Sequence, residues 1–203
     1  MNQTLAKILY VGGVTAFCTF LACWAVLAHQ ENTQGGITAR SQTRIGDEEF
    51  AKKAAQGGMA EVKLGQLAEE KAQSPEVKKF GKRMVEDHTK ASDELKQAAM
   101  KDNINLPSEP DPKDEAKYEQ LSKLSGTEFD KAYAREMVRD HEKDVSEFRR
   151  EATGGQKPEI KKFAAETLPT LQSHLKEARQ MEQATMRGGA GKTAKSPGAA
   201  AHR

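Results

Sequence analysis

Apolar residues recur at helical spacing in four long segments of the chain, and no segment alternates with period two for long enough to form a strand. Each segment has one apolar stripe, which must be covered in the folded protein. Two serines are predicted to be helix N-caps. Ser74 is followed by Pro75, which favours the first turn of a helix, and Ser125 stands three residues before Glu128, the spacing of a capping box. Four such helices bury their stripes best against one another, so the sequence predicts an all-α four-helix bundle. The predicted helices are 47–72, 75–102, 125–153 and 158–185.

Two parts of the sequence repeat themselves. The motif PEVKKF at 75–80 returns as PEIKKF at 158–163, and Glu-Phe at 49–50 returns at 128–129. The first helix therefore corresponds to the third and the second to the fourth, which indicates a helical hairpin used twice. The connection between the hairpins contains a predicted short helix at 112–124 and is far longer than the ~2–8 residues usual between neighbouring helices. Two hairpins with a long crossover form a ferritin-like bundle; a plain up-down bundle with a loose connection is the alternative.

The N-terminus has the pattern of a membrane signal. Residues 8–28 (ILYVGGVTAFCTFLACWAVLA) carry no charge and follow Lys7. At about 1.5 Å per residue, a helix of this length spans the ~30 Å hydrocarbon core of a membrane. Residues 1–28 are therefore predicted to be either an uncleaved inner-membrane anchor or a signal peptide cleaved after Ala28. In both cases the rest of the chain is exported to the cell envelope, tethered in the periplasm or secreted to the periplasm or outer membrane.

The remaining segments differ in composition. Residues 29–46 are polar and read as a linker, residues 47–185 form the predicted bundle, and residues 186–203 read as a disordered basic tail. Lys and Arg total 32 against 30 Asp and Glu, which argues against a nucleic-acid partner. Both cysteines, Cys18 and Cys23, lie in the apolar run, so the bundle has no thiolate metal site and no cysteine nucleophile.

Each of the four long helices carries one ionisable residue on its apolar stripe: Glu61, His88, His141 and His174. Buried ionisable groups need a partner, a proton or a metal. Counted from the turns, Glu61 and His88 lie at nearly the same height. His141 and His174 differ by five residues, about 7 Å, which makes one compact site of all four uncertain.

A metal site of imidazole and carboxylate suits a divalent transition metal, that is Zn, Fe, Cu or Mn. Asp87 and Asp140 adjoin two of the histidines and are expected to act as further ligands or as acceptors that orient the rings. The alternative is a hydrogen-bonded polar network that fixes helix register. The di-iron signature Glu-x-x-His is absent, because Val85, Val138 and Leu171 precede the histidines by three residues.

Four motifs carry a resemblance to a known family: AQGGMAE at 55–61, RMVEDH at 83–88, MVRDHEKD at 137–144 and TLPTLQSHL at 167–175. Together, over about residues 47–183, they resemble the bacterial domain-of-unknown-function family 4142. The resemblance implies a ferritin-like bundle and an exported or outer-membrane location, but no established activity.

The sequence has no phosphate-binding loop, nucleophile elbow or His-Glu-x-x-His motif, so we expect no enzyme. The expected function is an exported, membrane-tethered bundle with a role in metal binding or envelope stress protection. The alternatives are a metal-free interaction module of the envelope and a metalloenzyme. The expected partners are the membrane, through the N-terminal helix, and either a second copy of the chain or an envelope protein.

Overall fold

The computed structural model describes residues 46–190, which contain five helices and no strand. The all-α prediction is confirmed. The predicted signal or anchor and nearly all of the predicted linker lie outside the described residues. Within 46–190 no helix has the length and apolar character needed to span a membrane. The helices are α2 (Asp47–Lys71), α3 (Pro75–Lys101), α4 (Pro112–Ser122), α5 (Gly126–Gly154) and α6 (Pro158–Ala190).

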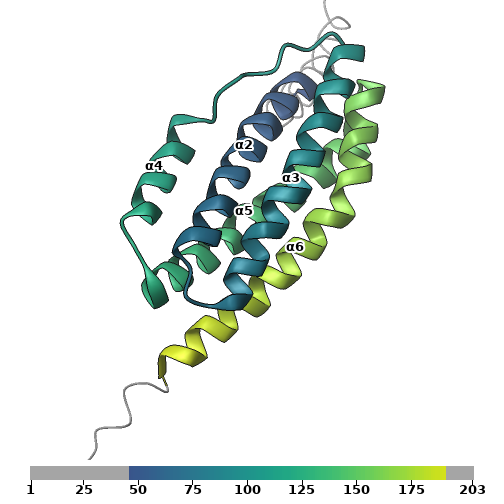
Figure 1. The fold of residues 1–203 in the computed structure, drawn as a ribbon. Coiled ribbons are helices and arrows are strands. Elements are labelled where there is room, and N and C mark those ends of the chain that lie inside the picture. Colours follow the sequence, from purple (N-terminus) through teal and green to yellow (C-terminus); the bar gives the residue numbers. More distant parts are fainter. Residues whose placement is uncertain (1–45, 191–203) are drawn as a thin grey trace, which may run out of the picture. The chain divides into compact units, whose positions relative to one another are not determined.

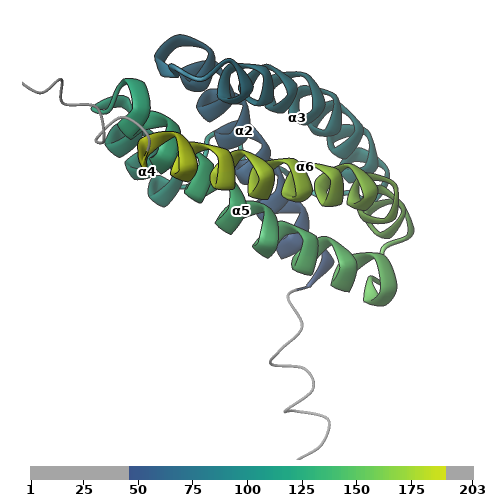
Figure 2. The same ribbon diagram turned by 90° about the horizontal axis from the view of Figure 1, so that it is seen from below.

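The four long helices form two hairpins, α2 with α3 and α5 with α6 (Figure 1). The hairpins contact each other through α3 with α6 and through α2 with α5. After α3, residues 102–111 and α4 run back along the outside of α2, so that α5 starts at the same end of the bundle as α3 (Figure 1). The helices α3 and α5 therefore run in the same direction, on opposite sides of the bundle when it is seen from below (Figure 2).

The inward-facing apolar residues form two clusters, one toward each end of the bundle. The first cluster includes Phe80, Met84, Tyr133 and Met137, and the second includes Phe148. On each long helix the change from one cluster to the other occurs near the ionisable residue predicted for that helix. The helical period therefore places a polar layer between two apolar cores, as the stripe positions indicated. The four ionisable residues are Glu61, His88, His141 and His174.

The start of α3 is capped differently from the prediction. Neither Ser74 nor Ser125 makes a side-chain cap hydrogen bond. Instead, the carboxylate of Asp130, near the start of α5, accepts hydrogen bonds from the backbone N–H groups of Gln73 (3.0 Å) and Ser74 (2.9 Å). The turn of the first hairpin is thus closed by a side chain of the second hairpin.

The turn of the second hairpin is closed in the same way by the first. Asp47, in the first turn of α2, accepts hydrogen bonds from the backbone N–H groups of Gln156 (2.5 Å) and Lys157. At the end of α3, Asp102 accepts from the N–H groups of Glu159 (3.1 Å) and Ile160 (3.0 Å) at the start of α6. Carboxylates at helix N-termini satisfy unpaired N–H groups and oppose the helix dipole.

The last helix is longer than predicted. It continues through Pro169 to Ala190, so residues 186–190 of the predicted disordered tail are helical. The rest of that tail lies outside the described residues.

The backbones of α2 and α3 touch at a pair of glycines. A Cβ atom built on Gly65 would lie 2.6 Å from the carbonyl oxygen of Gly81, and one built on Gly81 would lie 2.7 Å from that of Gly65. Neither carbonyl can move without distorting its helix. The close approach of the two helices therefore requires glycine at both positions.

We expect Gly65→Ala to lower the free energy of unfolding by about 1–3 kcal/mol, because the added methyl group overpacks this contact. The matched control is Gly57→Ala in the same helix, where the new Cβ meets nothing within 4 Å. That change should raise the free energy of unfolding by about 0.5–1 kcal/mol, the usual gain of alanine over glycine in a helix. Urea denaturation measures both, and equal effects of the two changes would contradict a glycine contact.

Candidate metal centre

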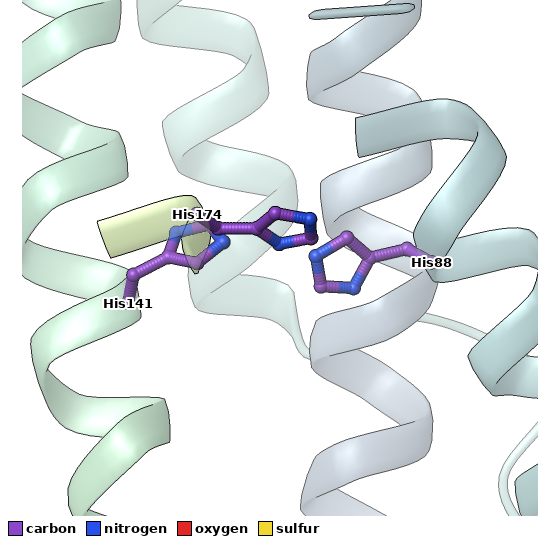
Figure 3. Close-up of side chains that lie close together, drawn as sticks. All are labelled: His88, His141 and His174. Atoms are coloured by element: carbon purple, nitrogen blue, oxygen red, sulfur yellow. The ribbon is translucent and has the colours of Figure 1, made fainter. Parts of the chain in front are cut away.

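Three histidines meet in the polar layer between the two apolar clusters (Figure 3). His88 comes from α3, His141 from α5 and His174 from α6, and one ring nitrogen of each lies within 4.8 Å of the others. The ring centroids are 5.3–5.8 Å apart, and the three residues are 7%, 0% and 1% exposed. We call these residues the histidine triad. Their spacing is short enough for one ion to contact all three rings.

Hydrogen bonds fix the tautomers of two of the rings. His141 Nδ1 lies 2.9 Å from the carbonyl oxygen of Met137, and His174 Nε2 lies 2.7 Å from the Asp87 carboxylate. Because both partners are acceptors, these nitrogens carry the hydrogens. His141 Nε2 and His174 Nδ1 are then left with free lone pairs. Both are buried without a hydrogen-bond partner, as is Nε2 of His88.

Asp87 links His174 to a charged network between α3 and α6. Its carboxylate also accepts a hydrogen bond from Arg83 Nε (3.1 Å), and Arg83 forms an ion pair with Glu177 and reaches Ser173 Oγ at 3.3 Å. Burial raises the pKa of Asp87, but the hydrogen bonds from His174 and Arg83 outweigh it and hold that pKa below its usual value. An ionised carboxylate behind a metal-binding histidine is the usual means of orienting the ring.

Burial keeps the histidine triad neutral. It lowers the pKa of His141 to about 4, and it lowers the pKa of His88 well below 6.5, with a further contribution from the other two rings. Burial also lowers the pKa of His174, against the opposing effect of its hydrogen bond to Asp87. Neutral imidazole is the form that binds a metal, so protons compete weakly for these nitrogens at neutral pH.

The predicted offset between His141 and His174 is wrong, because their ring centroids are 5.3 Å apart. The predicted offset counted the residues of the turn between α5 and α6 as if they were part of a helix. His141 lies 13 residues before the end of α5 at Gly154, and His174 lies 16 residues after the start of α6 at Pro158. The remaining difference of three residues is a rise of about 4.5 Å, which two imidazole side chains bridge.

Glu61 is buried in the same layer, with 3% exposure, but it does not join the histidine triad. Burial raises its pKa well above 4.5, and the carboxylates of Asp140 and Asp144 raise it further, against Lys117. Counting residues along α2 predicted the height of Glu61 but not the direction of its side chain around the helix axis. Its electrostatic neighbours belong to α4 and α5, so the structure groups the three histidines without Glu61, and a role of Glu61 at the metal stays a prediction.

A lysine of α4 stands in the middle of these carboxylates. The Lys117 ammonium lies 2.8 Å from Asp140, 3.2 Å from Glu136 and 3.2 Å from Asp114. Asp140 therefore pairs with Lys117 rather than with the neighbouring histidine. Sequence reasoning missed this contact, because α4 carries no periodic signal that indicates which helices it covers.

A partly open cleft of about 420 Å³ lies beside the histidine triad. His88 and His174 line it together with Thr167 and Gly57, whose missing side chain leaves room in the wall. The Oγ1 atom of Thr167 is buried without a hydrogen-bond partner. The cleft gives two of the three metal-binding candidates a route to solvent.

Comparison with known proteins identifies the family of this chain and solved structures with a similar fold. The family model described as "Domain of unknown function (DUF4142)" matches residues 32–181, and the chain belongs to that family. No functionally curated protein matches the chain.

Solved structures with a similar fold include a DUF305 fragment from Deinococcus radiodurans, which is 17% identical with a TM-score of 0.58 over 70% of this chain and 95% of that chain. CopM in the Cu(I)-bound form is 19% identical with a TM-score of 0.58, over 69% and 97% of the two chains. CopM in the Ag-bound form is 20% identical with a TM-score of 0.57 over the same shares. At these identities the likeness shows the fold alone.

Proposed function

We propose that this member of the DUF4142 family holds one transition-metal ion at His88, His141 and His174, inside a ferritin-like bundle of two hairpins. Two observations carry the proposal together: one ring nitrogen of each histidine lies within 4.8 Å of the others, and each ring has a buried nitrogen without a hydrogen-bond partner. A network that served only to fix helix register would pair such nitrogens, because buried polar atoms rarely lack a partner. A metal ion satisfies all three at once.

The ring nitrogens that are already hydrogen-bonded support the same function. Met137 and Asp87 hold His141 and His174 in the tautomers that leave the other, buried nitrogen of each ring with a free lone pair. The similar fold of CopM, which has been solved with Cu(I) and with Ag, adds that a bundle of this kind accommodates a metal ion. The function that follows is metal binding, with protection of the envelope against metal stress as its biological role.

The apolar run at residues 8–28 supports an envelope location for this function. We place the bundle outside the cytoplasmic membrane, tethered by that run or released after its cleavage, with a second copy or an envelope protein as a partner. Membrane fractionation, together with the mass of the mature N-terminus, tests the location. Recovery of the bundle from the cytoplasm would contradict it.

Metal content tests the function directly. The purified full chain, stripped with a chelator, should take up about one equivalent of at least one of Zn(II), Cu(I), Fe(II) and Mn(II). Elemental analysis after desalting measures the ratio. The control is the double change His29→Ala and His202→Ala, which removes the two histidines outside the described residues and should leave the ratio unchanged. Less than a tenth of an equivalent of every metal would refute the proposal.

A further inference from the structure

Two buried methionines each precede a histidine of the triad by one helical turn. Met84 precedes His88 by one turn of α3, and Met137 precedes His141 by one turn of α5. Both are completely buried and belong to the same apolar cluster. Because α3 and α5 run in the same direction, both side chains lie on the same side of the triad.

Ring contacts show that the triad packs against the apolar cluster to which the methionines belong. The Phe80 ring lies 6.3 Å from the His141 ring and 6.4 Å from the Tyr133 ring. His141 and Tyr133 are two turns apart on α5, so Phe80 lies level with Met137, which is halfway between them. Phe80 is also 6.3 Å from His174. The apolar cluster that contains both methionines therefore begins next to the imidazoles.

The orientation of His141 brings its ring toward this cluster. Side chains on a helix point back toward its N-terminus, over the preceding turn. The bond from His141 Nδ1 to the Met137 carbonyl oxygen shows that the ring does lie over the turn that holds Met137. Methionine has three rotatable bonds and adapts to its surroundings, so its sulfur can approach an ion held by the rings.

Charge and ligand softness favour the same class of ion. The histidine triad supplies neutral nitrogen, and the cost of burying an ion grows with the square of its charge, so a monovalent ion costs roughly a quarter of a divalent ion of equal size. Thioether ligands select Cu(I), whereas Zn(II) gains little from them. An apolar layer with two thioethers below neutral imidazoles is matched to a soft monovalent ion.

We propose that Met84 and Met137 supply thioether sulfur to the ion at the histidine triad and make the site selective for Cu(I) or Ag(I) over Zn(II). The inference rests on the proposed function, because it assigns the ion that the three histidines hold. The ion enters from the cleft, on the side that His88 and His174 line, and the methionines contact it from the opposite side.

The test is the double change Met84→Leu and Met137→Leu in the full chain. Leucine keeps the volume and the apolar character of the core, so the protein stays folded. Competition with a coloured Cu(I) chelator under anaerobic, reducing conditions should show Cu(I) affinity lowered by about 10–100-fold, whereas Zn(II) affinity stays within about twofold. The matched control is Met181→Leu, a buried methionine of the same cluster two turns beyond His174, which should change neither affinity.

X-ray absorption at the copper edge gives a second readout, in which the wild type shows a sulfur neighbour and the double variant does not. Unchanged Cu(I) affinity, an equal loss for both ions, or a wild type that prefers Zn(II) would each overturn the role of the methionines while leaving the triad as a metal site. A wild-type chain that binds neither ion would instead overturn the proposed function, and the methionine proposal with it.

Discussion

Replacing His88 by alanine should lower the affinity for the bound metal ion by more than about 100-fold. Loss of an outer hydrogen-bond partner of a ligand already costs about 10–100-fold, and His88 is proposed as a ligand itself. The two rings that remain, His141 and His174, leave the ion with an incomplete set of nitrogens. Competition titration with a metal chelator, on protein whose fold is verified by circular dichroism, measures the change.

Asp87→Asn provides a graded comparison for the His88 variant. The amide keeps the shape of the carboxylate but loses the charge that fixes the His174 tautomer, so we expect a smaller loss of about 10–100-fold. If the histidines formed only a structural network, His88→Ala would change stability by about 1–3 kcal/mol without changing metal content. Unchanged metal occupancy in that variant would rule out His88 as a ligand.

Asp144→Asn should stabilise the protein at alkaline pH. Burial raises the pKa of Asp144 from 3.8 to about 7, so the folded state holds a proton that the unfolded state releases. The stability that this group contributes is complete below pH 3.8 and is lost as the pH rises through 7. The difference between 3.8 and about 7 corresponds to about 4 kcal/mol. Because Asp144 is partly exposed, we expect Asp144→Asn to raise the free energy of unfolding at alkaline pH by about 2 kcal/mol.

The comparison of two pH values isolates the effect of Asp144. Urea denaturation at pH 5 and at pH 8 should show a gain from Asp144→Asn that is larger at pH 8 by about 1 kcal/mol, because part of the effect between pH 3.8 and about 7 is already present at pH 5. The lowered pKa values of the histidines affect wild type and variant equally and cancel. Asp93→Asn, at an exposed carboxylate of α3 paired with Lys96, is the control and should change stability by less than about 0.5 kcal/mol at both pH values. A gain from Asp144→Asn that does not depend on pH would contradict the raised pKa.

The sequence predicted the helices closely because their limits are set by local chemistry. The second helix was expected at 75–102 and runs from Pro75 to Lys101, since proline favours the first turn of a helix. The histidine triad was also accessible from sequence. Each of its members lies on the apolar stripe of its helix. The stripe can be identified from the sequence of that helix alone, and it predicts which residues are buried.

What the sequence could not predict depends on two helices together. The direction of Glu61 around α2 is decided by which neighbours meet that side, and α4 brings Lys117 to the nearby carboxylates without any periodic signal. The serine caps were predicted from local motifs, but Asp130 of the other hairpin took over the amides near Ser74. Local motifs identify a helix start, whereas the tertiary structure decides which side chain satisfies it.

The exchange of aspartates between the hairpins makes each hairpin depend on the presence of the other in the same polypeptide. Asp130 closes the turn of the first hairpin and Asp47 closes the turn of the second. A lone hairpin would leave the backbone N–H groups of its turn without these acceptors, and it would have to associate with a second hairpin in solution. The presence of both hairpins in one chain makes that encounter intramolecular, with an effective concentration that separate hairpins in solution would seldom reach.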